Sequence, residues 1–172
     1  NDHNFFEIAH TVNRLSKYIH LYNFVDNHDI ERIVTKLNDK RNFLPVHIML
    51  YTLPGIPSIY YGSEFGIEGH KYRNGTDDEI RPKLNIDDYK DCLDTNPYTQ
   101  IIAKLNHFRK DNTILSYGEY KQIELRKEYY SYSRSLDNER IFVCLINNNT
   151  PHDFYFDSNE TYHGLFNDEE YV

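Results

Sequence analysis

Residues 24–29 read FVDNHD, an apolar strand end that runs directly into a polar tetrad. Further along, residues 56–64 read IPSIYYGSE, a second apolar run that ends in Gly-Ser-Glu. A carboxylate and an imidazole just past the carboxyl end of a buried strand lie where α/β barrels place their chemistry. The two stretches therefore indicate both the fold and the position of a site.

The chain between these stretches predicts a strand–helix–strand unit. Its elements are a buried strand at 21–25, a helical turn at 30–37, a mostly buried helix at 42–53 and a strand at 57–61. Such a crossover is right-handed and joins two parallel strands, whose carboxyl ends open on one face. We therefore expect Asn27, His28, Asp29 and Glu64 to lie at the same surface.

Helices and a long loop flank this unit. Near the start, apolar residues recur at spacings of three and four and predict an amphipathic helix. Its inner stripe would consist of Phe5, Ile8, Val12, Leu15 and Ile19. Residues 62–95 are rich in glycine and charge, which is typical of a long functional loop. Asn96 as cap and Pro97 in the first position start another helix, which should end near Lys110.

The character of the sequence changes after residue 111. Short segments of β-type composition, separated by polar turns, predict strands at 120–125, 129–136, 140–147, 152–156 and 161–166. This spacing indicates an antiparallel sheet or sandwich, so we divide the chain into an α/β part at 1–115 and an all-β part at 116–172. Two parallel strands cannot close a barrel, and a parallel pair is normally covered on both faces. We therefore expect the first part to be the end of a larger parallel fold and the second to be truncated.

Composition excludes some classes of function. The 172 residues carry a net charge of −8, which argues against a nucleic-acid-binding protein. No apolar run is long enough to span a membrane, so we expect no membrane partner. Cys92 and Cys144 are far apart and lack metal-ligand spacing, which favours two unpaired thiols.

Asp29 and His28 offer a grip for vicinal hydroxyl groups. A carboxylate accepts two hydrogen bonds and an imidazole nitrogen can donate one, which suits a sugar ring. The alternative is a polar strand end, in which His28 caps the next helix and Asp29 pairs with Arg32. A metal site that also uses Asp26 and Glu64 is a weaker alternative, because the paired histidines common in metal-binding barrels are absent. We expect no metal here.

Asp77 and Arg81 stand four residues apart in the long loop. As a local ion pair they would stabilise the loop only slightly. Alternatively, they reach a ligand beyond the first binding position. Glu64 follows a strand and is either an acid or a structural cap, and the pattern alone favours neither.

These motifs together resemble the C-terminal portion of the α-amylase family of glycoside hydrolases. FVDNHD at 24–29 is similar to the family signature after the seventh barrel strand. LPGIPSIYYGSEFGIEG at 53–69 is similar to the passage through the eighth strand. DDEIR at 77–81 is similar to the family's Asp-Pro-x-x-Arg, with Asp78 in place of proline. The resemblance implies the end of a (β/α)8 TIM barrel followed by an antiparallel β-sandwich.

The resemblance also implies roles for individual residues. Asp29 would be the catalytic carboxylate that stabilises the transition state by binding two ring hydroxyls. His28 would bind the same sugar, with Asn27 beside it, and Asp77 and Arg81 would contact the next sugar. Glu64 matches a family position that is not catalytic. The partner would be an α-glucan or maltooligosaccharide.

The family's nucleophile and acid/base lie on strands that would precede residue 1. We therefore expect a fragment of a retaining glycosidase that is inactive alone and exposes apolar faces meant for its neighbours. The family's calcium site would also lie in the missing part, and no cofactor is expected in this segment. Two alternatives stay open: a non-catalytic interaction subunit, and a transglycosylase or phosphorylase of the same family.

Overall fold

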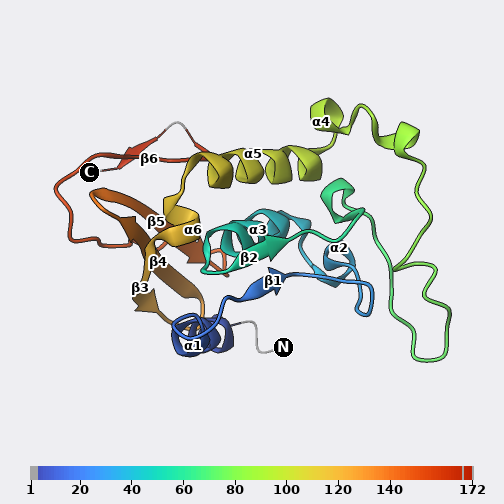
Figure 1. The fold of residues 1–172 in the computed structure, drawn as a ribbon, viewed down its shortest axis with the longest axis horizontal. Coiled ribbons are helices and arrows are strands. Elements are labelled where there is room, and N and C mark those ends of the chain that lie inside the picture. The colour runs from blue at the N-terminus through green and yellow to red at the C-terminus, as the bar shows by residue number, and fades with distance from the viewer. Residues whose placement is uncertain (1–3, 168, 172) are drawn as a thin grey trace.

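The computed structural model describes residues 4–167 and 169–171. An α/β half at one end of the molecule is joined to a β-sheet at the other, and a long loop extends from the α/β half (Figure 1). The helices are α1 Phe6–Leu15, α2 Ile33–Lys36, α3 Phe43–Thr52, α4 Cys92–Thr95, α5 Pro97–Asp111 and α6 Ile114–Tyr117. The 3-10 helices are η1 Lys40–Asn42, η2 Ser63–Phe65 and η3 Ile86–Tyr89. The strands are β1 Tyr22–Phe24, β2 Ile56–Ser58, β3 Glu119–Leu125, β4 Tyr129–Leu136, β5 Glu139–Ile146, β6 Tyr162–His163 and β7 Glu170–Tyr171.

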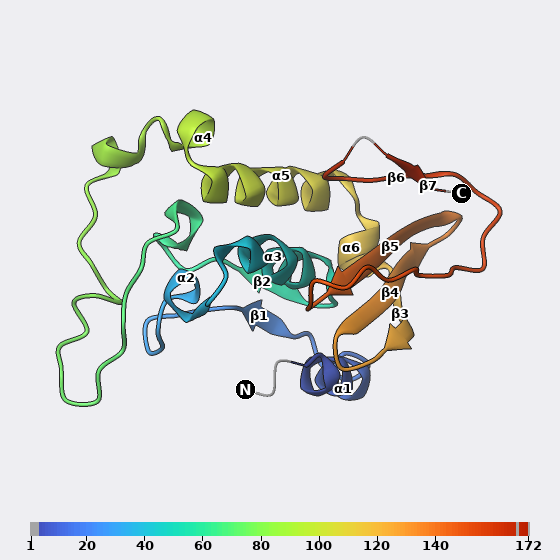
Figure 2. The same ribbon diagram turned by 180° about the vertical axis from the view of Figure 1, so that it is seen from behind.

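The predicted strand–helix–strand unit is confirmed. β1 and β2 pair in parallel, with Tyr22 opposite Ile56 and Phe24 opposite Ser58. In both ribbon views α3 and α5 lie side by side, and β2 lies between β1 and α5 (Figures 1 and 2). The carboxyl ends of the two strands therefore point the same way, toward the long loop.

One expectation for this sheet is wrong, because β1 is not buried. The side of the sheet that carries Tyr22, Phe24 and Ile56 is open, and these residues are 65%, 45% and 58% exposed. The opposite side packs toward the helices, where α2, α3 and α5 share one core. The sheet is thus covered on one face by the described residues, whereas a parallel pair is normally covered on both.

The flanking helices follow the sequence with one shift. Asn96 caps α5 by accepting hydrogen bonds from the backbone nitrogens of Tyr98 and Thr99, and Pro97 is its first residue. In α1, however, Ala9 and Val12 are buried, whereas Ile8 is 37% exposed. The predicted inner stripe is therefore wrong at Ile8, because α1 turns the neighbouring Ala9 face to the β-sheet. It is also wrong at Ile19, which is 54% exposed because α1 already ends at Leu15.

The C-terminal part contains an antiparallel sheet in the order β3-β4-β5, and these three strands are confirmed. The strand predicted at 152–156 is absent from the ladders, and the one predicted at 161–166 shrinks to β6, which pairs with β7. Residues 152–156 pack through their rings instead, since Phe156 stacks on Phe142 with centroids 4.1 Å apart. Aromatic composition predicts burial against a sheet as readily as pairing within one.

The main sheet shares a core with the α/β half. The buried residues of this core are Ala9, Val12, Leu53, Tyr130, Tyr132, Val143 and Leu145. Because α1 and the end of α3 contribute to it, the sheet holds the turn that leads into β2. Within the described residues, no helix combines the length and the hydropathy needed to cross a membrane.

Candidate active site

The loops after β1 and β2 bring the predicted polar residues together. Asn27 Oδ1 accepts a hydrogen bond of 2.8 Å from the backbone nitrogen of Asp29. This bond closes a tight turn directly after the strand. As a result the Asp29 side chain projects at the carboxyl end of the sheet and is 62% exposed. Asn27 therefore shapes the loop, and its side-chain oxygen is engaged in this hydrogen bond.

Asp29 is held on both of its oxygens. His28 Nε2 lies 3.1 Å from Oδ2, and an Arg81 terminal nitrogen donates to Oδ1 at 3.0 Å. Arg81 Nε also donates to the backbone oxygen of His28 at 2.9 Å. These contacts fix the carboxylate and the imidazole relative to each other while leaving both accessible to solvent.

Asp77 joins this cluster through the same guanidinium. Its Oδ2 lies 2.8 Å from Arg81, and its Oδ1 pairs with Lys71. The hydrogen bond from Lys71 lowers the pKa of Asp77; partial desolvation opposes this, and the Arg81 charge lowers the pKa further. The local ion pair expected between Asp77 and Arg81 is present, and it reaches Asp29 as well. The structure thus brings together Asn27, His28, Asp29, Asp77 and Arg81, although their functional roles stay predictions.

Asp26 is the first residue of the Asp-Asn-His-Asp stretch at 26–29. It is only 1% exposed, and its side chain points away from the Asp29 cluster. It accepts hydrogen bonds from the backbone nitrogen of Ile33 at 2.8 Å and from Ser63 Oγ at 2.8 and 2.9 Å. Asp26 therefore caps α2 and ties the loop after β1 to the loop after β2. No local pattern predicts the contact between Asp26 and Ser63, because the two residues are distant along the chain.

The structural alternative for this stretch is wrong in its partners. It is Asp26, and not His28, that satisfies the start of α2. Arg32 does not pair with Asp29; its guanidinium donates to the Tyr61 backbone oxygen at 2.7 Å and to Ser63 Oγ at 3.2 Å. Neither the capping of α2 nor the pairing of Arg32 therefore depends on His28 or Asp29.

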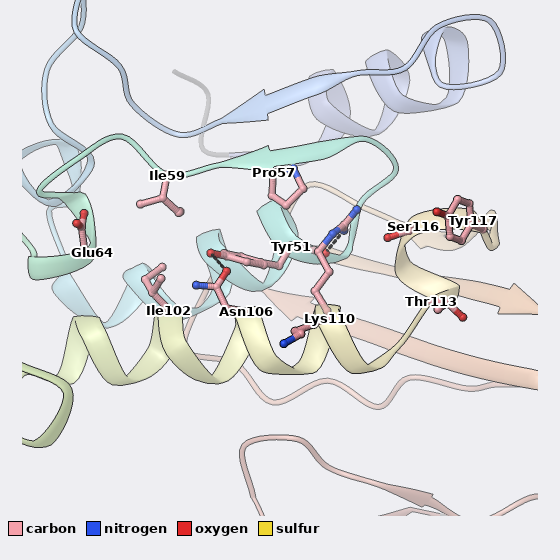
Figure 3. Close-up of a pocket in the computed structure, with 11 residues that line it drawn as sticks. Tyr51, Pro57, Ile59, Glu64, Ile102, Asn106, Lys110, Thr113, Ser116 and Tyr117 are labelled. Carbon is pink, nitrogen blue, oxygen red and sulfur yellow. Dashed lines mark hydrogen bonds between the residues drawn. The ribbon is translucent and has the colours of Figure 1, made fainter.

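Glu64 is at the predicted end of the strands, but its side chain points elsewhere. It lines a pocket of about 690 Å³ between β2 and α5, together with Tyr51, Ile59 and Asn106 (Figure 3). Its Oε2 is buried and has no hydrogen-bond partner among the described residues. The expectation that Glu64 opens onto the same surface as Asp29 is therefore wrong, because η2 turns the side chain toward the helices.

The Asp29 cluster lies on an open surface, outside this pocket. A larger hollow of about 1410 Å³ lies between β5, the end of α5 and residues 152–167 and 170–171, and it too is not lined by the cluster. We take the cluster as the candidate site, because its charged groups converge at the carboxyl ends of the two parallel strands. Across residues 4–167 and 169–171, no group of three or more His, Cys, Asp or Glu side chains is placed to hold a metal.

The arrangement can grip a polyhydroxylated ligand. The two Asp29 oxygens can accept hydrogen bonds from neighbouring hydroxyls, and the contact with Arg81 orients the carboxylate. Asp77, the second carboxylate of the cluster, pairs with both Lys71 and Arg81. These two positive charges leave it poorly suited as a nucleophile. The cluster is therefore better suited to binding and charge stabilisation than to bond cleavage by itself.

Comparisons with known proteins relate this chain to one family of enzymes. Residues 3–92 match the family model for the alpha-amylase catalytic domain. The chain is 32% identical over 143 residues to a cyclomaltodextrin glucanotransferase of Bacillus sp. (strain 1-1), covering 83% of this chain and 19% of that protein. It is 28% identical over 144 residues to an intracellular maltogenic amylase of Bacillus subtilis (strain 168), covering 81% and 23%. The chain thus spans about a fifth of the length of these curated relatives.

Solved structures show the same fold. An Anoxybacillus alpha-amylase superposes with a TM-score of 0.76 at 18% identity, covering 98% of this chain and 38% of that one. A gamma-cyclomaltodextrin glucanotransferase from alkalophilic Bacillus clarkii gives 0.74 at 23% identity, covering 95% and 24%.

Proposed function

Because this chain belongs to the α-amylase family, we propose that the cluster around Asp29 is part of an active site for α-glucans. It would bind the sugar ring whose glycosidic bond is cleaved. The observation that carries the proposal is the position of Asp29, which is fixed by His28 and Arg81 at the carboxyl ends of two parallel strands. In α/β barrels, the catalytic groups lie at the carboxyl ends of the strands.

Each residue of the cluster has a role in this proposal. Asp29 accepts hydrogen bonds from two ring hydroxyls, and these bonds strengthen as positive charge develops on the ring. His28 binds the same ring, and Asn27 shapes the loop that presents both. Asp77 and Arg81 contact the next sugar along the chain, with Arg81 also orienting Asp29.

The nucleophile and the acid/base would come from outside the described residues. A retaining mechanism requires two carboxyl groups about 5 Å apart, one as nucleophile and one as proton donor. Asp77 is neutralised by Lys71 and Arg81, and Glu64 faces a different pocket. On this proposal β1 and β2 are the last two strands of a (β/α)8 barrel, and residues 116–172 belong to the β-domain that follows it.

Transfer of the sugar to another sugar, instead of to water, is a second candidate. It is favoured by a specific finding, since the relative at 32% identity is a cyclomaltodextrin glucanotransferase. The two reactions share the sugar-binding role of Asp29 and differ in the acceptor. Products formed from maltohexaose would separate them: linear shorter sugars for hydrolysis, and cyclic or lengthened sugars for transfer.

Calorimetric titration with maltohexaose tests the shared binding role. Asp29→Asn removes the charge but keeps the shape, and should weaken binding by about 10- to 100-fold, as expected for hydrogen bonds to a charged group. Asp39→Asn is the matched control, because Asp39 pairs with Arg41 and lies outside the cluster. Equal affinity for maltohexaose and the β-linked cellohexaose, or equal affinity of both variants, would contradict the proposal.

A further inference from the structure

Arg32 is a fully buried cation close to the Asp29 cluster. Its exposed fraction is 0%, and it immediately precedes α2. One terminal nitrogen donates to the Tyr61 backbone oxygen and to Ser63 Oγ. In the part of the chain that the structure describes, Nε and the other terminal nitrogen have no hydrogen-bond partner. A buried charge that is so incompletely paired is costly, so its position calls for an explanation.

The charge of Arg32 is placed against aromatic rings. Its guanidinium carbon lies 4.3 Å from the centroid of the Tyr60 ring and 5.2 Å from that of Tyr61. Attraction between a cation and an aromatic face is strongest where water is excluded. Tyr60 in turn lies beside His28, with ring centroids 6.4 Å apart. Arg32 thus supports the ring that His28 packs against.

Arg32 also anchors the long loop. Its backbone nitrogen donates to the oxygen of Gly69 at 3.0 Å. A Cβ atom on Gly69 would come within 2.3 Å of the Glu79 backbone oxygen and 3.2 Å of Arg32 Cγ, so the loop crosses tightly over this side chain. The same loop continues to Arg81, which pairs with both Asp29 and Asp77.

We propose that Arg32 is the positioning residue that holds the Asp29 cluster together. Its guanidinium ties down the loop after β2 and the Tyr60 ring, and its backbone ties down the loop that carries Arg81. It does not touch the sugar itself. This role rests on the proposed function of the cluster, but the geometry that it predicts can be measured without any ligand.

The test compares Arg32→Lys, Arg32→Met and Ser63→Ala with the control Arg41→Met. Arg41 lies on the surface and pairs with Asp39. The readout of geometry is the NMR signal of the Arg81 Nε–H, which donates to the His28 backbone oxygen and is not in contact with Arg32. The readout of function is the Kd for maltohexaose, and thermal melting verifies that each variant folds.

We expect Arg32→Met to shift or broaden the Arg81 Nε–H signal and to raise the Kd about tenfold, since small displacements of binding groups are costly. Arg32→Lys keeps a cation near Tyr60, so its change in the Arg81 signal and its rise in Kd should be smaller than those of Arg32→Met. Ser63→Ala, a smaller change, should move the signal in the same direction. Should Arg32→Met not fold, Arg32→Lys and Ser63→Ala decide the matter.

Unchanged Arg81 signals in folded Arg32→Lys and Ser63→Ala, as in Arg41→Met, would overturn the proposal. Absence of maltohexaose binding in the unsubstituted protein would instead overturn the proposed function. The Arg81 signal would still decide the role of Arg32 in that case.

Discussion

Replacement of Arg134 by methionine should weaken the junction between the β-sheet and the α/β half. Arg134 lies in β4 and is 1% exposed. It donates hydrogen bonds to the backbone oxygens of Thr52 at 2.7 Å, Leu115 at 3.0 Å and Gly118 at 2.8 Å. It therefore joins the end of α3, α6 and the start of β3 at one point.

The structure sets the size of the effect. Arg134→Met keeps most of the volume but leaves these carbonyl oxygens without their donor, and two of the three bonds are buried. An unsatisfied buried group costs about 1–3 kcal/mol. Removing a buried charge returns part of this, because burial makes the charge itself unfavourable. We therefore expect the free energy of unfolding to fall by about 2–4 kcal/mol, which for this size corresponds to a decrease in Tm of about 5–15 °C.

Urea and thermal unfolding followed by circular dichroism measure this change. The control is Arg126→Met, since Arg126 has a side chain 67% exposed and pairs with Glu124 at the surface. Its effect should stay below about 1 kcal/mol. If Arg134→Met were no more destabilising than Arg126→Met, the reasoning that Arg134 joins the two halves would be refuted.

Three further predictions concern stability and association. Asn96→Ala removes the cap of α5 and should lower the free energy of unfolding by about 1–2 kcal/mol in urea, whereas a loss below about 0.3 would contradict the cap. Burial lowers the pKa of His47 in the folded protein, so the unfolded chain binds a proton at this residue more readily than the folded protein does. The free energy of unfolding should therefore fall as the pH drops from about 7.5 to about 5. This decline should be flatter in His47→Gln, and equal slopes of stability against pH in the variant and the unsubstituted protein would contradict the prediction. Ile56→Ser on the open face of the sheet should reduce self-association in sedimentation experiments. Unchanged association would show that this face does not mediate association.

The features that the sequence predicted well depend on neighbours along the chain. Asn96 and Pro97 mark the start of α5 because the cap bonds reach only two and three residues ahead. The parallel pairing of β1 and β2 follows from the helix between them, since a crossover leaves few other arrangements. For the same reason the clustering of His28 and Asp29 at the strand ends was predictable.

The features that the sequence missed depend on contacts between distant segments. Ile8 and Ala9 both fit a helical stripe, and only the β-sheet decides that Ala9 is inside. Glu64 follows a strand as expected, but η2 rotates its side chain toward α5. The contacts of Arg32 with Tyr60 and Gly69 span the strand–helix–strand unit, so no local pattern reveals them.

The most direct test of the central claim is the kcat/KM of Asp29→Asn on maltohexaose. It requires a chain that contains residues 1–172 and turns over this substrate, with Asp39→Asn as control. If Asp29 stabilises the transition state, kcat/KM should fall by about 10²- to 10⁴-fold while the Tm stays within a few degrees, because Asp29 is exposed at a strand end. A loss of less than about tenfold in a variant with unchanged melting would show that Asp29 is a bystander and that the active site lies elsewhere.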